Sequence, residues 1–357
     1  MIQRRAADTN HADEDGTLLS AQDLVKHFPI GRGKGRTVVR AVNGVSFTIQ
    51  RGETLGLVGE SGSGKTTVGR LILGLLRPTS GGIAFQGEQV VTPERAYGNV
   101  ATRRRIQAVF QDPYGSLNPR MRVRDTLREA ARQLGVAGSK AEADDLAREL
   151  LRMVGLSAGV AARFPHELSA GEQQKVGIAR AFASHPDVIV LDEPTSALSP
   201  QAREDLVELL RDVQARTGTS YLFISHDLSV VREIATRVAV MYLGKIVALG
   251  SGSDIFAHPV HPYTEALLSS ILRPDPTQRG TVKVLSGEIP SPIHIPPGCA
   301  FASRCDWAID ACRSVEPPLE PVLLGPGQVM HVSCGRAEER LAHIAQRRDV
   351  DVSEAHS

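Results

Sequence analysis

The chain has 357 residues, with 41 Lys or Arg against 40 Asp or Glu and a formal net charge of +1. This near balance argues against the polybasic surface of a nucleic-acid-binding protein. The length suggests about two domains with sizeable cores. No apolar run approaches the roughly 20 residues that span a bilayer, and residues 1–17 are too polar for a signal peptide. We therefore expect a cytoplasmic chain, whose membrane role, if any, comes through a partner.

A phosphate-binding loop is the first motif along the chain. Residues 59–66, GESGSGKT, fit the pattern GxxxxGK followed by Ser or Thr, between an apolar run at 54–58 that predicts a buried strand and a helical pattern at 67–76. Glycines let several N–H groups face one anion, and the helix start adds its positive dipole end. We expect a bound nucleotide triphosphate, with Lys65 reaching its β- and γ-phosphates and the Thr66 hydroxyl holding Mg²⁺. The alternative is a Gly/Ser-rich turn without a ligand. The residues expected to line the nucleotide are Gly59, Glu60, Ser61, Gly62, Ser63, Gly64, Lys65, Thr66 and Thr67.

Two carboxylates end a second apolar run, at residues 187–193. Four consecutive apolar residues suit the centre of a parallel sheet, where ligands bind at the carboxyl ends of the strands. Asp192 is expected to hold Mg²⁺ through water. Glu193, directed to the opposite side, is expected to polarise the attacking water. The alternative is a pair of solvated acids that closes the strand.

A histidine and a glutamine follow two further apolar segments. A strand predicted at 220–224 leads to His226, which at such a strand end is a candidate contact to the γ-phosphate or else a structural hydrogen-bonding group. Gln111 precedes Pro113, which stops a short apolar segment. Its amide can bind Mg²⁺ or orient water, or it is an ordinary loop residue. Thr66, Gln111 and Asp192 are thus the expected Mg²⁺ ligands.

One more segment decides which proteins the chain resembles. The motifs in chain order are the phosphate loop at 59–66, Gln111, the segment LSAGEQQK at 168–175, Asp192 with Glu193, and His226. With them the chain resembles the nucleotide-binding subunit of an ATP-binding cassette transporter over about residues 18–255. The resemblance implies ATP hydrolysis by an α/β fold: a RecA-like P-loop NTPase core with an antiparallel β subdomain and an inserted α-helical subdomain at about 113–186. It also implies two subunits that close face to face around two ATP molecules, with Ser169 and Gly171 completing the partner's site.

The segment 168–175, which we call the signature segment, and the nearby Ser199 depart from the usual pattern of the family. Ser169 and Glu172 form a capping-box pattern at a helix start. The family usually has Gly where this chain has Ala170, Gln where it has Glu172, and Asp where it has Ser199. The methyl group of Ala170 limits how closely the backbone can approach the partner's ATP. The carboxylate of Glu172 repels a triphosphate unless it is engaged in capping the helix. We expect an asymmetric pair of ATP sites, with tolerated substitutions as the alternative.

Adenine has one aromatic candidate. Phe28 lies where related cassettes place an aromatic residue that stacks on the base, in a chain of which only 4% is aromatic. The alternative is a phenylalanine packed under the loop at 32–36, because stacking cannot be recognised from spacing.

Helical periodicity marks the segments 124–132 and 141–154. They match the helical subdomain of a cassette, which meets the membrane protein near Gln111. Transport is expected to be coupled there.

The composition changes near residue 256. Of 21 prolines, 12 lie within 259–326, and all four cysteines lie within 299–334. This shift predicts a separate Pro/Cys-rich C-terminal appendage at 256–345. Polar ends at 1–17 and 346–357 predict a disordered tail and a frayed tail.

Three segments narrow the resemblance to the oligopeptide/dipeptide importer ATPases. They are FQDPYGSLNP at 110–119, HPYTEALL at 261–268 and GCAFASRC at 298–305. The first is closer to the F-type of the two ATPase subunits. The resemblance implies a D-type partner ATPase, two transmembrane permeases, an extracytoplasmic substrate-binding protein and a peripheral place on the cytoplasmic face of the membrane. An ATPase does not contact the cargo, so related solutes such as nickel, opines or glutathione stay open.

The four cysteines raise a separate question. Cys299, Cys305, Cys312 and Cys334 are separated by five, six and 21 residues. Zinc ribbons use closer pairs, so tetrahedral zinc is less favoured, and a cytosolic setting disfavours disulfides. Some importers of this family carry a 4Fe–4S cluster at matching cysteines, which the resemblance extends to this chain. Unliganded thiols are the other alternative.

Two rival classes share the phosphate loop. A soluble cassette ATPase of DNA repair or translation usually has a second cassette, a long coiled coil or a zinc module, none of which the sequence shows. P-loop kinases and GTPases have no counterpart of the segment 168–175 or of Glu193.

Overall fold

The computed structural model describes residues 16–31, 37–97, 100–269 and 290–354, with side chains as far as residue 346. The chain forms two compact units, each taken over its described residues. The first comprises Met1–Gln22, Phe47–Thr54 and Val68–Ser225, and the second Asp23–Ser46, Leu55–Thr67 and His226–Ser357. Most of the expected tail at 1–17 and the loop at 32–36 lie outside the described residues, although Thr17 already belongs to a strand.

Four elements pass from one unit to the other: β1 (Thr17–Ile30), β2 (Thr37–Gln50), β3 (Thr54–Val58) and α1 (Lys65–Ile72). The first unit adds β4 (Ser80–Phe85), β5 (Glu88–Val91), α2 (Val100–Arg105), β6 (Ile106–Val109), α3 (Pro113–Ser116), α4 (Val123–Gln133), α5 (Lys140–Met153), α6 (Ala170–Phe182), β7 (Val188–Asp192), α7 (Pro200–Thr217) and β8 (Ser220–Ser225). The second unit adds α8 (Leu228–Ile234), β9 (Arg237–Tyr242), β10 (Lys245–Ser251), α9 (Gly252–Ala257), α10 (Pro262–Ser269), α11 (Asp310–Ser314), β11 (Glu320–Gly325), β12 (Gln328–Val332) and α12 (Ala337–Glu354).

A buried parallel sheet is the centre of the first unit. Its strands run in the order β8-β7-β6, with Val190 of β7 level with Ala108 on one side and Leu222 on the other. All five residues of β7 and all six of β8 are buried, as the unbroken apolar runs predicted. Parallel strands require long crossovers, and here helices form them. The carboxyl ends of β7 and β8 therefore open at one edge.

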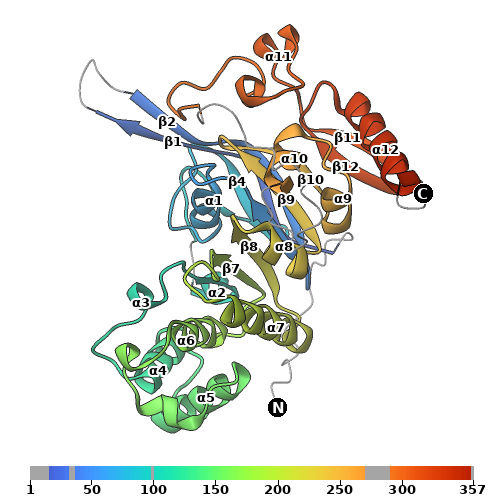
Figure 1. Ribbon diagram of the computed structural model, residues 1–357. Helices are drawn as coiled ribbons and strands as arrows, with labels where there is room; N and C mark the ends of the chain where they lie inside the picture. Colours follow the sequence, from blue (N-terminus) through green and yellow to red (C-terminus); the bar gives the residue numbers. More distant parts are fainter. Residues whose placement is uncertain (1–15, 32–36, 98–99, 270–289, 355–357) are drawn as a thin grey trace. The chain divides into compact units, whose positions relative to one another are not determined.

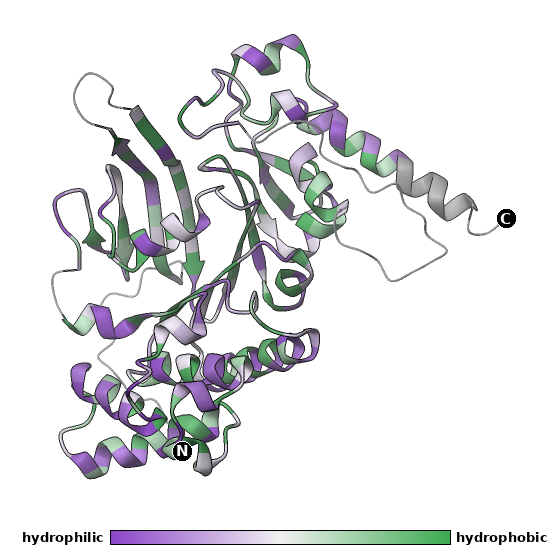
Figure 2. Ribbon diagram, turned by 60° about the vertical axis from the view of Figure 1, so that its left-hand side comes forward, coloured by the Kyte–Doolittle hydropathy of each residue, from purple (hydrophilic) through white to green (hydrophobic). Residues whose placement is uncertain are grey.

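The helical subdomain is the long crossover between β6 and β7. Here α4, α5 and α6 contact one another, and Figure 1 shows them gathered with α3. Leu127, Leu150 and Ile178 are fully buried. In Figure 2 these helices carry both hydrophobic and hydrophilic residues along their length. The one-sided apolar pattern explains why the segments fold as packed helices.

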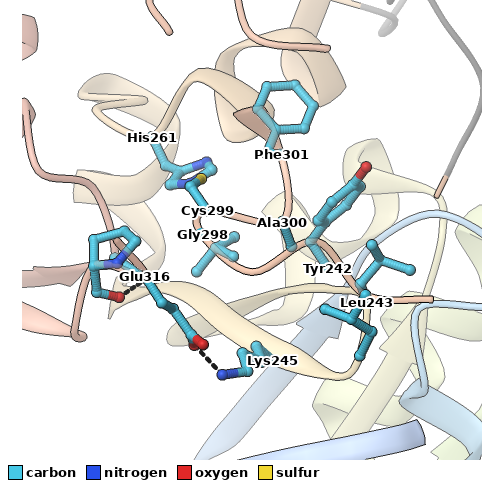
Figure 3. Close-up of a pocket in the computed structure, with 13 residues that line it drawn as sticks. Tyr242, Leu243, Lys245, His261, Gly298, Cys299, Ala300, Phe301 and Glu316 are labelled. Atoms are coloured by element: carbon cyan, nitrogen blue, oxygen red, sulfur yellow. Dashed lines mark hydrogen bonds and ion pairs between the residues drawn. The ribbon is translucent and has the colours of Figure 1, made fainter. Parts of the chain in front are cut away.

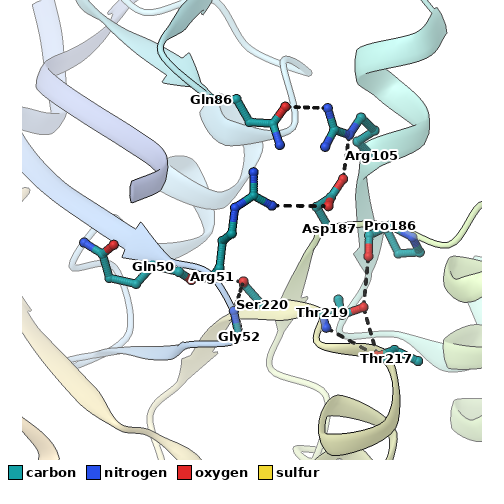
Figure 4. A network of polar contacts seen from close by, with 10 residues as sticks. All are labelled: Gln50, Arg51, Gly52, Gln86, Arg105, Pro186, Asp187, Thr217, Thr219 and Ser220. Atoms are coloured by element: carbon teal, nitrogen blue, oxygen red, sulfur yellow. Dashed lines mark hydrogen bonds and ion pairs between the residues drawn. The ribbon is translucent and has the colours of Figure 1, made fainter. Parts of the chain in front are cut away.

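Polar side chains join the amino-terminal ends of the strands in the first unit (Figure 4). Asp187, just before β7, accepts from Arg105 Nε at 2.6 Å and forms a longer ion pair with Arg51 at 3.8 Å. Ser220 at the start of β8 accepts from Gly52 N at 2.8 Å and donates to Gln50 O at 3.0 Å. These contacts tie the turn after β2 to the sheet. The opposite edge of the sheet, at the carboxyl ends of the strands, carries Asp192 and Glu193.

The antiparallel part is a four-stranded sheet in the order β2-β1-β4-β5. Within it β4 and β5 form an antiparallel hairpin, and Gln86 in its turn donates from its backbone to Leu18 O at 2.9 Å. This agrees with the antiparallel β subdomain that the sequence resemblance implies.

The second unit includes the described part of residues 256–345, which the sequence predicted as a separate appendage. Its strands run in the order β11-β12-β10-β9-β3, where β3 and β9 are parallel and the other pairs antiparallel. In Figure 1 α12 lies along β11, and the two are in contact. The backbone of α12 continues to Glu354, so much of the end expected to be frayed is helical.

The helix after the phosphate loop is shorter than its apolar pattern suggests. We expected it to extend over 67–76, but α1 ends at Ile72. Gly74 has a φ of 64°, and Leu75 N donates to Arg70 O at 2.9 Å, which is the hydrogen-bond pattern of a left-handed helix end. A Cβ on Gly74 would also lie 2.4 Å from the Tyr97 ring. Among the described residues, no helix is both long and apolar enough to span a bilayer.

Candidate nucleotide-binding site

The phosphate loop follows β3 and owes its shape to two crowded glycines. Gly59 has a φ of 153° and Gly64 one of 106°. A Cβ on Gly59 would lie 2.1 Å from Met241 O, and one on Gly64 would lie 2.3 Å from Ala41 O. No side chain fits at either place. The loop therefore follows the path for which the pattern requires glycine.

Lys65 begins α1 and is only 4% exposed. Its Nζ donates to Gly59 O at 2.7 Å and to Glu60 O at 2.9 Å. The turn between β9 and β10 supports the same loop, because Gly244 N donates to Ser63 O at 2.9 Å. The ammonium group is thus held inside the loop, as expected for a group that meets phosphate oxygens.

Glu193 has a backbone conformation that the sequence did not reveal. It lies one residue past β7 with a φ of 47°, which costs a residue other than glycine about 1–3 kcal/mol. Its N–H donates to Ile224 O at 2.9 Å, and its carbonyl accepts from Ser196 Oγ at 3.0 Å. Gln111 Nε2 donates to Glu193 Oε2 at 3.1 Å. Such strain is characteristic of functional positions.

The structure brings Gln111 and Glu193, two of the predicted catalytic residues, into direct contact. We expected strand alternation to separate Glu193 from Asp192, yet Glu193 is beyond the strand and its direction follows from its left-handed backbone. Asp192 is the last residue of β7 and 8% exposed. The oxygen atoms of Asp192, Gln111 and Thr66 are donors that suit Mg²⁺. Gln111 and Asp192 belong to the first unit, whereas Thr66 belongs to the second.

His226 also belongs to the second unit, directly before the cap of α8. Asp227 caps that helix by accepting from Ser229 N at 3.0 Å. His226 therefore stands at the end of β8, where the sequence placed it. Its approach to a γ-phosphate stays a prediction, as does the meeting of Thr66 with the carboxylates.

The signature helix α6 begins with the capping box expected from its sequence. Ser169 Oγ accepts from Glu172 N at 3.2 Å, and Glu172 Oε2 accepts from Ser169 N at 2.9 Å. This backbone hydrogen bond is the main reason that the pKa of Glu172 lies below its usual value. The extra carboxylate is therefore engaged in capping. Gly171 has a less crowded position, where a Cβ would meet Ala202 Cβ at 3.7 Å.

One link between motifs was missed by sequence reasoning. Arg180 of α6 donates to Ser116 O of α3, five residues after Gln111. Burial lowers the pKa of Arg180 below its usual value. Phe110 and Tyr114, beside Gln111, are 39% and 53% exposed. The signature helix and the Gln111 segment are thus attached to each other next to exposed aromatic surface.

Phe28 lies in β1 with its side chain half-buried. Lys26 Nζ is 5.1 Å from the centre of its ring, a cation–π distance. One contact of the Phe28 ring is therefore with the Lys26 ammonium group. Stacking of this ring on adenine stays a prediction. The loop at 32–36, the alternative packing partner, lies outside the described residues.

The four cysteines lie near one another in the second unit. Cys299 N donates to Cys312 O at 2.8 Å, which places two of their segments side by side. Burial, followed by the charges of the other three thiolates, raises the pKa of Cys305 to about 11. Among the described residues no group of three or more His, Cys, Asp or Glu side chains is arranged to hold a metal ion. The thiols are therefore neighbours without the spacing of ligands.

Aromatic residues fill the space beside Cys299, around a cavity of about 20 Å³ that is large enough for about one water molecule (Figure 3). Tyr242 and Phe301 meet edge to face at 5.3 Å. His261 Nδ1 accepts from Tyr263 N at 3.1 Å, and burial lowers the pKa of His261 to about 3. This neutral, packed core supports the C-terminal segments.

Comparison with known proteins decides the family. The family model described as ABC transporter matches residues 42–196, and that of the oligopeptide/dipeptide transporter C-terminal region matches 247–312. A Sinorhizobium fredii protein named "Probable peptide ABC transporter ATP-binding protein y4tS" is 46% identical over 331 residues, 92% of each chain. A Brucella abortus protein carrying the name peptide import ATP-binding protein is 47% identical over 316 residues, 87% of this chain and 93% of its own. The chain belongs to the ATP-binding proteins of peptide ABC transporters.

Solved structures agree with the fold of this ABC ATPase. The chain resembles the ATP-binding cassette MJ0796, determined as a dimer bound to ADP and phosphate, with a TM-score of 0.58 and 28% identity over 66% of this chain and 98% of that one. It also resembles cbiO1 from Clostridium perfringens, with a TM-score of 0.58 and 26% identity over 69% of this chain and 92% of that one. The cassette is therefore a P-loop NTPase fold, and ATP hydrolysis coupled to transport is the activity of its family.

Proposed function

We propose that this ABC ATPase is the F-type subunit of a peptide importer and closes face to face with a D-type ATPase subunit. Two transmembrane permeases and an extracytoplasmic substrate-binding protein complete the assembly, and the ATPase binds at the cytoplasmic face of the membrane. The observation that carries this proposal is the match along both the cassette and the C-terminal region to relatives named for peptide import. A role in DNA repair or translation is not favoured, because nothing in those names or in the charge balance points to nucleic acid.

Each candidate residue has a proposed role in ATP hydrolysis. Lys65 and the loop N–H groups bind the phosphates, and Phe28 stacks on adenine. Glu193 polarises the attacking water while His226 contacts the γ-phosphate. Thr66, Gln111 and Asp192 supply oxygen ligands for Mg²⁺. Ser169 and Gly171 complete the nucleotide site of the partner ATPase. The hydrogen bond between Gln111 and Glu193 supports the assignment of these two residues to one site.

The Gln111 segment is the proposed permease contact. Its support is the exposed surface of Phe110 and Tyr114 together with the bond from Arg180 to Ser116. A permease that presses on this segment would thereby act on α6, the helix that meets the partner's ATP. Binding and transport are then linked through packed side chains.

Reconstitution tests the proposed function. The chain is co-expressed with candidate permease and D-type ATPase subunits of a peptide importer from the same organism, and the complex is purified through a tag on this chain. We expect both permeases to co-purify, and the vesicle-reconstituted complex to hydrolyse ATP faster when binding protein and peptide are added. A chain that purifies without permeases and hydrolyses ATP independently of peptide would contradict the proposal.

The signature departures predict a mild asymmetry between the two ATP sites. Replacing Ala170 with Gly and Glu172 with Gln should raise ATP turnover of the assembled complex by about two- to fivefold, because the backbone at position 170 can then approach the partner's ATP more closely. The charge of Glu172 is already engaged in the cap and should contribute little. Gln can still accept from Ser169 N, so the cap is retained. Steady-state phosphate release measures the effect. An unchanged rate would mean that both residues are tolerated substitutions without asymmetry.

A 4Fe–4S cluster on Cys299, Cys305, Cys312 and Cys334 is a further part of the proposal. Its support is the proximity of the thiols, seen in the backbone hydrogen bond from Cys299 to Cys312 and in the raised pKa values of Cys299 and Cys305. Binding to iron would offset the burial and the mutual repulsion that disfavour their thiolate forms. Protein purified without oxygen should be brown, absorb near 400 nm and contain iron, and Cys305→Ser should bleach it. Colourless, iron-free protein from such a preparation would refute the cluster.

A further inference from the structure

The C-terminal appendage contacts the phosphate loop directly. Arg304, close to Cys305, forms a two-pronged ion pair with Glu60, the second residue of the loop. NH1 lies 2.8 Å from Oε2 and NH2 lies 3.0 Å from Oε1. The side chain of Arg304 is 5% exposed and that of Glu60 is 23% exposed. Such parallel, charge-assisted hydrogen bonds are among the strongest and the most directional in proteins.

Glu60 is also held through its backbone. Its N–H donates to the hydroxyl of Tyr263 at 2.7 Å, and its carbonyl accepts from Lys65 Nζ at 2.9 Å. Tyr263 comes from α10, which like Arg304 belongs to the appendage. Three groups of one loop residue are therefore engaged, two of them by residues far along the sequence.

The groups that hold Glu60 stand on a rigid support. The Tyr263 ring packs 4.6 Å from Tyr242 and 5.4 Å from Phe301, and all three side chains are at most 2% exposed. Arg304 NH1 also reaches the Tyr242 hydroxyl at 3.4 Å. The positions of Arg304 and Tyr263 are thus determined by packing, so they can impose a position on the loop.

Electrostatics gives this contact a consequence for ATP. Glu60 places a carboxylate in a loop built to bind a polyanion, which disfavours phosphate unless the carboxylate is neutralised. Arg304 supplies the opposite charge and turns the carboxylate away into an ion pair. Removing Arg304 alone would leave the repulsive charge, whereas removing both charges would not.

We propose that Arg304 and Tyr263 are positioning residues for ATP, which fix and neutralise Glu60 so that the phosphate loop can accept a triphosphate. We call the Arg304–Glu60–Tyr263 contact the latch. The inference rests on the assignment of residues 59–66 to ATP binding. It adds that the C-terminal domain of this ATPase is part of the nucleotide site.

Binding of ATP to the full-length chain tests the latch. We expect Arg304→Gln to weaken ATP binding about tenfold or more, which corresponds to about 1.4 kcal/mol. Glu60→Gln combined with Arg304→Gln should return to within about threefold of wild type, because both charges are then absent. Arg304→Lys should lie between, since it keeps the charge but loses the two-pronged geometry. The loss of affinity in Arg304→Gln should be largest for ATP, smaller for ADP and smallest for AMP. In hydrolysis assays, the same substitution should raise KM for ATP with little change in kcat.

The chain offers a matched control in Arg340. This arginine is 1% exposed, belongs to the same unit and pairs with Glu265 at 2.8 Å. Arg340→Gln should lower the thermal unfolding midpoint yet leave the ATP affinity of the folded protein unchanged. An Arg304→Gln variant that likewise loses only stability would overturn the latch.

Hydrogen exchange tests it without any variant. By linkage, ATP must stabilise the elements that stabilise its site, so MgATP should slow amide exchange in residues 261–265 and 300–305 of the wild type. Unchanged exchange there in the presence of bound ATP would refute the latch but not ATP binding. A wild type that binds no ATP would instead refute the assignment of the loop.

Discussion

Glu193→Gln should lower ATP turnover of the assembled transporter by about 10²–10⁴-fold, the usual contribution of a general base. The substitution removes the charge but keeps an oxygen that can accept from Gln111 Nε2, now 3.1 Å away. It also keeps the backbone contacts at a φ of 47°. ATP affinity should therefore change little while phosphate release nearly stops. Single-turnover phosphate release and equilibrium ATP binding, measured on the same preparation, separate these two effects.

A second glutamate provides the control for Glu193. Glu167 accepts from Phe164 N at 2.7 Å, so it too combines a carboxylate with a local backbone contact. Glu167→Gln should hydrolyse ATP at the wild-type rate. If Glu193→Gln does the same, another group activates the water and the proposed role of Glu193 is wrong.

Lys65→Met should weaken ATP binding by about 10²–10³-fold, because it removes two or more charge-assisted hydrogen bonds to phosphate. Methionine has nearly the length of lysine and fits the buried stem, which is 4% exposed. The loss should appear in the dissociation constant for MgATP, measured by calorimetry on the isolated subunit.

Lys245 supplies the matched control for that experiment. It is a partly buried lysine of the same unit, and it pairs with Glu316 beside the cavity in Figure 3. Lys245→Met should bind ATP as the wild type does. Equal affinity in Lys65→Met would show that this loop is not the phosphate site.

The elements that carry the site were largely predictable from the sequence. The strands at 54–58, 188–192 and 220–224 follow from unbroken apolar patterns, which burial on both faces of a parallel sheet produces. The capping box at Ser169 was also predicted, because it depends only on residues three apart. These features depend on residues that are close together in the sequence, so the sequence alone was enough to predict them.

The features that were missed depend on distant residues. The left-handed backbone of Glu193 is held by the carbonyl of Ile224 on the next strand along the chain, together with the nearby Ser196. The residues next to Glu193 in the sequence do not predict this conformation. The partner of Glu60 lies 244 residues away. The segments 261–268 and 298–305 were recognised only as motifs that resemble a family. They contain Tyr263 and Arg304, whose contacts with Glu60 became visible only in the structure.

That separation of 244 residues along the chain has a consequence for synthesis. A ribosome finishes the phosphate loop long before it reaches Arg304. Until then a nascent cassette would carry an unneutralised Glu60 at its nucleotide site. Premature binding of ATP by an unfinished subunit would thus be disfavoured by the order in which the chain is translated.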